Sequence, residues 1–447
     1  MACKLLIESH LKLRSQTTCQ GGALVTTIVI SALVGLMLSA YLSMVSTQIT
    51  FTQRSQIWNN CIPLCEGGVE EALAHLNHQH TVSNFAINGW VEERGIFHKN
   101  RLFDQGECLM RIDGSYPPII TVVGKIPGPL GNGTVARTVR VRTRLNQRFP
   151  TAILARGTIN MGGGARLDSF NSTNDLESTN GRYDPAEATD HAMIATVSRT
   201  PGDLNLGNAD IYGSVATGPG GTVTVGPNGN VGSEAYNNNP ANNGTVEAGH
   251  YKDNANMQIP DGELPDPFGP TLSPQPGIVD SVSYTYVLES ADYRINAIEL
   301  RAKQNILVKG KARIYVLGAT SVSGQARIII APGGSLELYA GRAVDLAGGG
   351  VMNNGYAKDF SIIGLNTCTG VKYAGNSEFT GTIYAPHADV TMIGTSDAYG
   401  AFVGKSFMIG GTMDLHYDEA LRGETHRGRF LADSWEETKF DPSWEEL

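Results

Sequence analysis

The sequence predicts a mainly β protein with one long apolar helix near its N-terminus, and three observations support this. Glycine contributes 53 of the 447 residues, or about 12 %, against roughly 7 % in an average chain. Charged residues make up only 17 %, against about 25 % in ordinary proteins. Residues 23–45 contain no charge at all. A coiled coil or helix bundle is rich in charge and poor in glycine, so turn-rich β structure has to account for most of the chain.

Net charge and glycine spacing exclude other classes. The formal net charge is −9, whereas a nucleic-acid partner requires a basic surface that releases counterions. Glycine shows no three-residue period, and 41 % of the residues are hydrophobic. The composition therefore excludes collagen and argues against disorder, and we predict no nucleic-acid partner.

Residues 23–45 (ALVTTIVISALVGLMLSAYLSMV) predict a membrane-spanning helix. At about 1.5 Å per residue they are long enough to cross a hydrocarbon core of roughly 30 Å. The preceding residues 1–22 hold three cations and one anion: Lys4, Lys12, Arg14 and Glu8. The positive-inside rule then places residues 1–22 in the cytoplasm and the bulk of the chain outside a single-pass inner-membrane anchor. The alternative is a secretory signal peptide, whose apolar region is usually shorter, about 7–15 residues.

The order of the small residues favours retention of the helix. Gly21-Gly22 precedes the apolar run instead of following it. A basic leader, then glycine, then a long apolar helix resembles a type IV prepilin. That resemblance implies cleavage by prepilin peptidase between Gly22 and Ala23, with the helix kept on the mature protein. The sequence departs from typical major pilins, which have Phe and Glu where this chain has Ala23 and Thr27.

The helix is expected to continue past the membrane, so that residues 23–80 form a membrane-spanning and then amphipathic helix. Pro63 and Gly67-Gly68 predict a kink or a break near residue 63. The run EGGVEEALAHL at residues 66–76 resembles the stretch that follows the membrane helix in PilX-like pilus-assembly proteins. A long amphipathic helix suits a subunit packed into a filament, and the alternative is a simple anchor with a stalk.

Residues 81–150 predict a small β region. Strands are expected within residues 107–113, 117–127 and 136–146. In the last of these, Val and Thr alternate with Arg140, Arg142 and Arg144, which indicates a half-buried strand with a basic face. Following the helix, this region is expected to form a small α+β, pilin-like head.

Residues 151–421 predict a β-solenoid. From residue 305 on, short apolar triplets recur mostly every eight residues and are separated by glycine-containing turns. Three such strands with their turns give a rung of roughly 20–25 residues, within the range of solenoid repeats. We favour this fold over a β-sandwich, which has stronger hairpin signals. Residues 236–284 interrupt the pattern and predict an irregular, extended connection.

Three strings near the C-terminus carry a further resemblance. Residues 379–394 (FTGTIYAPHADVTMIG), 399–411 (YGAFVGKSFMIGG) and 415–421 (LHYDEAL) resemble the C-terminal domain of many PilX-like proteins. That resemblance implies an accessory, minor pilin-like surface protein that is not an enzyme. It also implies other pilin-like subunits and the pilus assembly machinery as partners.

The last residues, 422–447, form a charged tail with two SWEE repeats that contain Trp435 and Trp444. We predict that this tail folds back and caps the last rung of the solenoid. The alternative is a tail that docks a partner.

Candidate catalytic and metal-binding residues are few, so we predict no catalytic residue, no metal site and no cofactor. The histidines at 75, 78 and 80 have no further Cys or carboxylate at a recognised spacing that would complete a metal-ligand set. In LHYDEAL, His416 and Asp418 are expected to share a strand face and Glu419 to point away, and we predict a capping role for this closing motif. We interpret His387 and Asp389 as solvent-facing residues. The remaining acids show no evident stacking over neighbouring rungs: Asp345, Asp389, Asp397 and Asp414.

Six cysteines are present. Cys3 and Cys19 lie in the leader, and four others are expected in an exported, oxidising space: Cys61, Cys65, Cys108 and Cys368. Cys61 and Cys65 are close enough to form a disulfide if Pro63 bends the helix, whereas a regular helix would strain the bond. Free thiols are the alternative.

Three functions are compatible with the sequence. The first is a structural, pilin-like protein of a type IV pilus or related filament. The second is a membrane-anchored adhesin that binds surface glycans through the solenoid flank. The third is a β-helix polysaccharide lyase or hydrolase, which requires acidic and basic side chains clustered over adjacent rungs.

Overall fold

The computed structural model describes residues 20–78, 88–131, 133–265, 268–375 and 377–439. The chain is mainly β with one long N-terminal apolar helix, and it forms two compact units. Unit 1 comprises Met1–Leu145 and Phe430–Leu447, and unit 2 comprises Asn146–Arg429. In sequence, unit 2 is therefore inserted between two segments of unit 1.

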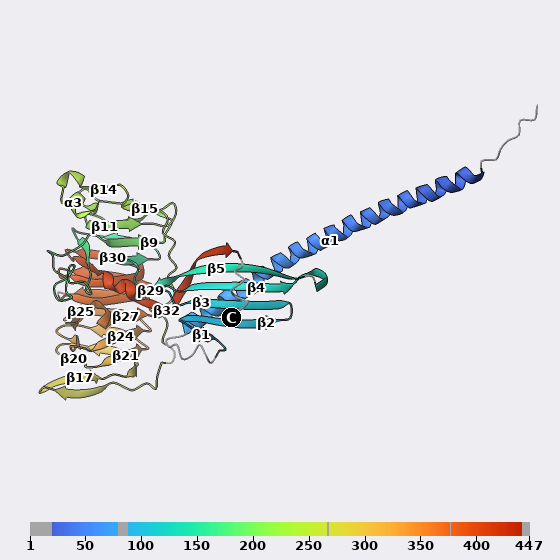
Figure 1. Ribbon diagram of the computed structural model, residues 1–447. Helices are drawn as coiled ribbons and strands as arrows, with labels where there is room; N and C mark the ends of the chain where they lie inside the picture. The colour runs from blue at the N-terminus through green and yellow to red at the C-terminus, as the bar shows by residue number, and fades with distance from the viewer. Residues whose placement is uncertain (1–19, 79–87, 132, 266–267, 376, 440–447) are drawn as a thin grey trace, which may run out of the picture. The chain divides into compact units, whose positions relative to one another are not determined.

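Unit 1 consists of helix α1 (Gln20–His78) and a six-stranded sheet with the order β1–β2–β3–β4–β5–β32 (Figure 1). The strands are β1 (Val91–Glu93), β2 (Ile96–Phe103), β3 (Gly106–Asp113), β4 (Ile119–Pro127), β5 (Thr134–Gln147) and β32 (Thr425–Thr438), with a short helix η1 (Pro129–Gly131). Strands β1 to β5 pair with their neighbours in antiparallel fashion. In β5, Val139, Val141 and Thr143 are buried while Arg142 and Arg144 are exposed, as the alternation predicts.

Helix α1 runs without interruption through Pro63, so the predicted break is wrong. Proline removes one backbone N–H and with it one intrahelical hydrogen bond. Pro63 lies on an exposed side of α1, whereas Cys61 and Cys65, on either side of it, are buried. We infer that packing of both flanking turns on the sheet keeps the helix continuous despite the lost bond.

The C-terminal turns of α1 pack on the sheet through one face. Cys65, Val69 and Ala72 are buried among side chains of β3, β4 and β5. Gly68 brings the helix close to the sheet: a Cβ there would lie 2.5 Å from Cys108 Sγ and 2.6 Å from Val122 Cγ1. The run EGGVEEALAHL at residues 66–76 is thus a packing motif, and its Gly68 faces the sheet.

Gly68→Ala is expected to be less stable than its matched control, Gly67→Ala, by about 1–3 kcal/mol, the usual cost of overpacking. Both variants gain the same helix propensity, but a Cβ at Gly67 meets nothing within 4 Å. The measurement is the denaturant concentration at which Cys108 of unit 1 becomes labelled by iodoacetamide under reducing conditions. Equal midpoints for the two variants would contradict the close approach.

The C-terminal tail does not cap the stacked strands of unit 2. Strand β32 instead lies beside β5 in the sheet of unit 1. Arg137 of β5 forms an ion pair with Glu437 at 2.7 Å, and Arg144 lies 3.6 Å from Asp433. These two ion pairs run in opposite directions along the two strands, as in an antiparallel pair. The predicted cap is wrong because the charged residues of the tail match the arginines of β5; Trp444 lies outside the described residues.

Unit 2 contains a 21-stranded sheet and a five-stranded sheet. Its first half has β6 (Ile153–Ala155), β7 (Ile159–Met161), β8 (Arg166–Phe170), β9 (Ala192–Thr196), β10 (Pro201–Asn205), β11 (Asp210–Ala216), β12 (Thr222–Thr224), β13 (Asn230–Gly232), α3 (Glu234–Asn237), η2 (Pro240–Asn242), β14 (Thr245–Val246) and β15 (Tyr251–Lys252). Its second half begins with β16 (Gln275–Val279), β17 (Val282–Leu288), β18 (Asp292–Ile295), β19 (Ile298–Leu300), β20 (Asn305–Val308), β21 (Lys311–Val316), β22 (Thr320–Val322), β23 (Arg327–Ile330) and β24 (Ser335–Ala340). It ends with β25 (Val344–Gly348), β26 (Val351–Asn353), η3 (Ala357–Asp359), β27 (Phe360–Gly364), β28 (Gly370–Gly375), β29 (Phe379–Gly394), β30 (Ala398–Gly411), β31 (Leu415–Asp418) and η4 (Glu419–Gly423).

The strands of unit 2 stack in parallel layers (Figure 1). Tyr293 pairs with Ile314, Ile314 with Leu338, and Leu338 with Ile362, in steps of 21, 24 and 24 residues. In β21, Ala312, Ile314 and Val316 are buried, and the residues between them are not. One face of each strand therefore fills a common core, and the period agrees with the rung length that the sequence predicts.

The order of the layers in space differs from their order in sequence. The second half builds up from β17 to β31, and the first half stacks on top of it. Strand β30 pairs with β6 and β7, and β31 pairs with β8. The motif LHYDEAL thus lies in the middle of the stack, and the prediction that it closes the repeat is wrong.

The segment that interrupts the pattern is only partly irregular, since residues 236–284 include β14, β15, β16 and the start of β17. Between β15 and β16, the chain crosses the outside of the stack within unit 2. There the Tyr384 hydroxyl donates to the Pro260 carbonyl at 2.6 Å, and the Phe268 ring meets Tyr339 edge-on at 6.1 Å. This crossing covers outward-facing aromatic side chains of β24 and β29.

The two ends of unit 2 lie side by side. The Arg148 N–H donates to the Glu424 carbonyl at 2.8 Å, and the Gln147 side chain donates to the Arg422 carbonyl at 3.0 Å. The chain therefore enters and leaves unit 2 at one place, at the level where its two halves meet.

Candidate functional site

The N-terminal part of α1 is apolar, and the described residues of unit 1 do not cover it. By length and composition it is long enough to cross a membrane, and its most apolar stretch has a mean hydropathy of 2.3 with none of it buried. Leu24, Leu36 and Met37 are 64 %, 68 % and 70 % exposed. Threonine hydroxyls in this part donate to carbonyls one turn earlier, as Thr26 does to Gly22 and Thr27 to Leu24. Such bonds satisfy hydroxyls within the helix, which an apolar environment requires.

The predicted processing pair, Gly22 and Ala23, lies in the first turn of α1 and is exposed. Residues 1–19 of the predicted leader lie outside the described residues. Cleavage after Gly22 would remove only the first residues of the helix and leave its apolar part intact.

Cys61 and Cys65 are buried thiols in the structure, without the predicted disulfide between them. Helix α1 is continuous through Pro63, and each thiol faces a different carbonyl of β5. The Cys61 sulfur lies 3.6 Å from the Val135 oxygen, and the Cys65 sulfur lies 3.4 Å from the Arg137 oxygen. In the continuous helix the two sulfur atoms thus have separate partners.

The buried thiols are expected to resist iodoacetamide at pH 8 in the folded protein. Burial raises the pKa of Cys65 to about 11 and that of Cys108 to about 12. Only about one Cys65 in a thousand is then a thiolate at pH 8, and only the thiolate reacts. Unfolding restores a pKa of about 8.5 and fast labelling.

The same experiment tests the predicted disulfide, by the mass of the peptide that spans residues 55–75. If the pair is oxidised, this peptide gains label in the unfolded protein only after reduction. Rapid labelling of Cys65 or Cys108 in the folded protein at pH 8 would contradict their burial.

The histidines near the end of α1 do not form a described ligand set. His75 is buried and stacks on Trp90, with ring centroids 5.1 Å apart. The side chain of His78 and the whole of His80 lie outside the described residues. Within the part of the chain that the structure describes, no three His, Cys, Asp or Glu side chains gather as a metal site.

His416 of the LHYDEAL motif belongs to a buried polar cluster in the middle of unit 2, where β31 pairs with β8. His416 Nδ1 lies 2.6 Å from Asp168 Oδ1, and these two side chains are 3 % and 1 % exposed. Arg166 Nε and the Tyr183 hydroxyl both donate to Asp168 Oδ2 at 2.8 Å. We call Arg166, Asp168, Tyr183, Tyr399 and His416 the seam cluster.

Aromatic stacking completes the seam cluster. The His416 ring has its centroid 3.7 Å from that of Tyr183 and 4.9 Å from that of Tyr399. Tyr399 and His416 are register partners in β30 and β31, and His416 and Asp168 are register partners in β31 and β8. The Tyr183 and Tyr399 ring centroids lie 5.8 Å from each other, and the His416 side chain that contacts both is only 3 % exposed. His416 therefore has little surface open to a substrate, and the cluster joins the two halves of unit 2.

The two acids that follow His416 have separate partners. As predicted, Asp418 shares a strand face with His416. Leu415 and Tyr417, which alternate with them along β31, point the other way and fill the core. Asp418 Oδ1 accepts the backbone N–H groups of Ser172 and Ala420. Glu419 accepts from Arg422 at 2.8 Å and lies 3.0 Å from His191.

The other candidate acids are dispersed, with one exception to our expectation. Asp389 accepts from Ser406, and His387 lies 2.8 Å from Asp261 of the crossing segment. Asp397 and Asp414 precede strands of neighbouring layers and are linked through the backbone, since Ala398 N donates to the Asp414 carbonyl. The prediction that these acids do not stack is therefore wrong for this pair.

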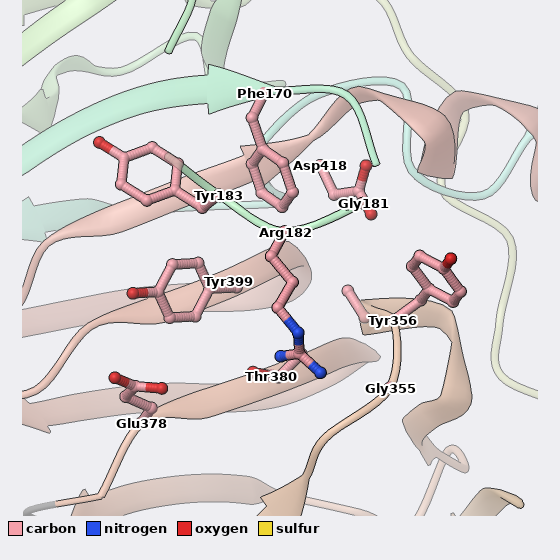
Figure 2. A pocket seen from close by; sticks show the side chains of 11 residues that line it. Phe170, Gly181, Arg182, Tyr183, Gly355, Tyr356, Glu378, Thr380, Tyr399 and Asp418 are labelled. Atoms are coloured by element: carbon pink, nitrogen blue, oxygen red, sulfur yellow. The ribbon is translucent and has the colours of Figure 1, made fainter. Parts of the chain in front are cut away.

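Beside the seam cluster lies a cavity of about 160 Å³, which we call the Arg182 cavity. Its lining residues are Phe170, Gly181, Arg182, Tyr183, Gly355, Tyr356, Ala357, Glu378, Thr380, Tyr399 and Asp418. Figure 2 shows the Arg182 side chain extending between Tyr399 on one side and Tyr356 on the other. Thr380 and Tyr399 are register partners in β29 and β30.

Sequence analysis missed most of these residues. Asp168 and His416 are 248 positions apart, and nothing local to either predicts that they meet. For Arg182 a signal exists: it follows Asn180-Gly181, a pair that favours a tight turn with positive φ at both positions. Their φ angles are +54° and +74°.

Comparisons with known proteins do not assign a function. The model of a family described as a domain of unknown function, DUF7305, matches residues 284–424. No curated protein matches the chain. Among solved structures, the competence-associated pilin ComZ from Thermus thermophilus is similar, with 11 % identity and a TM-score of 0.27, over 85 % of this chain and 97 % of ComZ. A similarity of this size defines no shared function.

Proposed function

We propose that this chain is a membrane-anchored, minor pilin-like structural protein that takes part in assembling a type IV pilus or a related filament. The division of α1 carries the proposal. Its N-terminal part is uncharged from residue 23 to 45 and exposed, and its C-terminal turns are buried against an antiparallel sheet. In this proposal residues 23–45 cross the inner membrane with a cytoplasmic N-terminus, and the rest is exported.

Exposed apolar side chains also continue beyond the proposed span. Ile49 and Phe51 are 52 % and 70 % exposed, and Trp58 is 41 % exposed. An anchor alone does not require apolar residues on this part of the helix. We propose other pilin-like subunits as the partners that cover them, with PilX-like proteins as the family that the sequence resembles.

We further propose that unit 2 is a β-solenoid and that its role is not catalytic. Parallel pairing in steps of 21–24 residues supports the solenoid. The exposed fractions of His416 and Asp168, 3 % and 1 %, support a structural role for the seam cluster. A lyase or hydrolase would instead expose its acidic and basic groups to the polymer.

The experiment is N-terminal sequencing of the protein purified from a bacterium that has a prepilin peptidase. The proposal expects the mature protein to begin at Ala23 and to co-purify with sheared surface filaments. Gly22→Val is expected to leave the leader attached, while the neighbouring Gly21→Val is processed normally. A mature protein that begins at Met1, or after Val45, would refute the proposal.

A further inference from the structure

We propose that the Arg182 cavity binds a single neutral sugar ring, either free or at the end of a glycan chain. This inference goes beyond the proposed structural role and does not depend on filament assembly. Four properties carry it: the size of the cavity, a cation without an ion-pair partner among the described residues, rigid aromatic walls and a balance of charges.

The size of the cavity limits the ligand. Pockets for drug-sized molecules measure roughly 300–1,000 Å³, and this cavity measures about 160 Å³. It therefore accommodates one ring and not an extended chain. It lies beside the middle layers of unit 2, with Phe170, Thr380 and Tyr399 contributed by β8, β29 and β30.

Arg182 lies on a turn with a fixed backbone, and its exposed side chain forms no ion pair with the described residues. The backbone of the turn is fixed by two reciprocal hydrogen bonds between Thr179 and Arg182, at 3.0 and 3.1 Å. Within the described ranges, neither Arg182 nor Glu378 takes part in an ion pair within 4.0 Å. Both side chains are exposed at the mouth of the cavity. Charged groups without a structural partner in a concave site are typical of ligand contacts.

The aromatic walls are rigid. The Tyr183 hydroxyl donates to Asp168 at 2.8 Å, and the Tyr399 hydroxyl donates to Asp397 at 3.2 Å. Both rings also stack on His416. Figure 2 shows the hydroxyls of Tyr183 and Tyr399 pointing away from Arg182, and both residues line the cavity. Walls that are already ordered lose little conformational entropy when a ligand binds.

The charges around the cavity balance. Arg182 lines the cavity. Lys358 is not a lining residue but lies beside it, with its Nζ 5.6 Å from the centroid of the lining Tyr356 ring. Glu378 and Asp418 supply two carboxyl groups. A ligand with a net charge would gain from one pair and lose from the other. A neutral sugar instead accepts hydrogen bonds from arginine, donates hydroxyl protons to carboxylates and lays its C–H face on an aromatic ring.

The experiment measures saturation-transfer NMR and titration calorimetry on the full chain in lipid nanodiscs, because many detergents carry sugar headgroups. The neutral probes are glucose, galactose, mannose and N-acetylglucosamine with their methyl glycosides, which represent the ends of glycan chains. Galacturonate and glucosamine are the anionic and cationic probes. At least one neutral probe is expected to bind, and more tightly than either charged probe.

The variants locate the binding. Arg182→Ala and Glu378→Gln are each expected to weaken binding of the neutral probe about tenfold or more, since each removes a charge-assisted hydrogen bond. Arg342→Ala, which removes an exposed arginine away from the cavity, is expected to bind as the unchanged protein does. Resistance of Cys368 to iodoacetamide in every variant verifies that unit 2 is folded.

Three results would overturn the proposal: no neutral probe binds, both cavity variants bind normally, or a charged probe binds as tightly as the best neutral one. Because filament co-purification is scored separately, a failure here is distinguishable from a failure of the proposed structural role.

Discussion

Asp168→Ala is expected to lower the free energy of unfolding of unit 2 by about 3–5 kcal/mol, the usual cost of removing one partner from a buried ionic network. Three groups lose their acceptor in this variant: the His416 ring, the Tyr183 hydroxyl and the Arg166 guanidinium. The His416 side chain is 3 % exposed, so it keeps its desolvation cost without a hydrogen bond. The Arg166 side chain is 38 % exposed and can bind water instead. The loss is concentrated where β31 pairs with β8.

Cys368 provides a local measurement of this loss, because it is the buried cysteine of unit 2, whereas Cys61, Cys65 and Cys108 report on unit 1. Asp168→Ala should move labelling of Cys368 to a lower denaturant concentration and leave labelling of Cys108 where it was. The matched control is Asp345→Ala, which removes an exposed carboxylate from β25. If the two variants label Cys368 at the same midpoint, the seam cluster does not hold the halves of unit 2 together.

Local patterns predicted the strands well, and the reason is physical. In β5, Val139 and Val141 are buried while Arg142 is exposed, because side chains alternate along any strand whatever its partner. The step of 21–24 residues between paired strands likewise follows the local spacing of apolar triplets and turns. Both properties are set within about 25 residues of chain.

The arrangement of the layers depends on contacts that no local pattern records. His416 was expected at the end of the repeat, yet the layer that begins at Ile153 stacks above it. The strand that contains Trp435 was expected to cap unit 2, yet it pairs with β5 through Glu437 and Arg137. In both cases a segment satisfies its exposed backbone edge with a partner far away in sequence, and several partners are compatible with the same composition.

The seam cluster and the Arg182 cavity share this origin. Asp168, Arg182 and His416 belong to segments that meet only when the first half of unit 2 closes on the second. The turn at Asn180-Gly181 is visible in the sequence, but the surface it faces is not. The position of Arg182 beside the cavity therefore becomes apparent only from the fold.

Gly348→Ala is expected to destabilise unit 2 by about 2–5 kcal/mol, the sum of two costs. Gly348 ends β25 with φ +66°, which costs other residues about 1–2 kcal/mol. A Cβ there would also lie 2.0 Å from the Gly324 oxygen in the layer below. That atom is backbone and cannot rotate aside, so the layers have to separate, which adds about 1–3 kcal/mol.

Variants at two other glycines of unit 2 distinguish the cost of the positive φ angle from the cost of the close contact between layers. Gly333 has φ +78° but open space around its Cβ position, so Gly333→Ala should show only the conformational cost, about 1–2 kcal/mol. Gly164 has neither constraint, and Gly164→Ala should be neutral or stabilise by up to about 1 kcal/mol. The midpoint for labelling Cys368 ranks the three variants. If Gly348→Ala is no worse than Gly333→Ala, the corners tolerate a side chain between layers, and the glycine content of the chain reflects turn conformation alone. If it is worse, part of that content is required because each corner lies directly against the backbone of the layer beneath it.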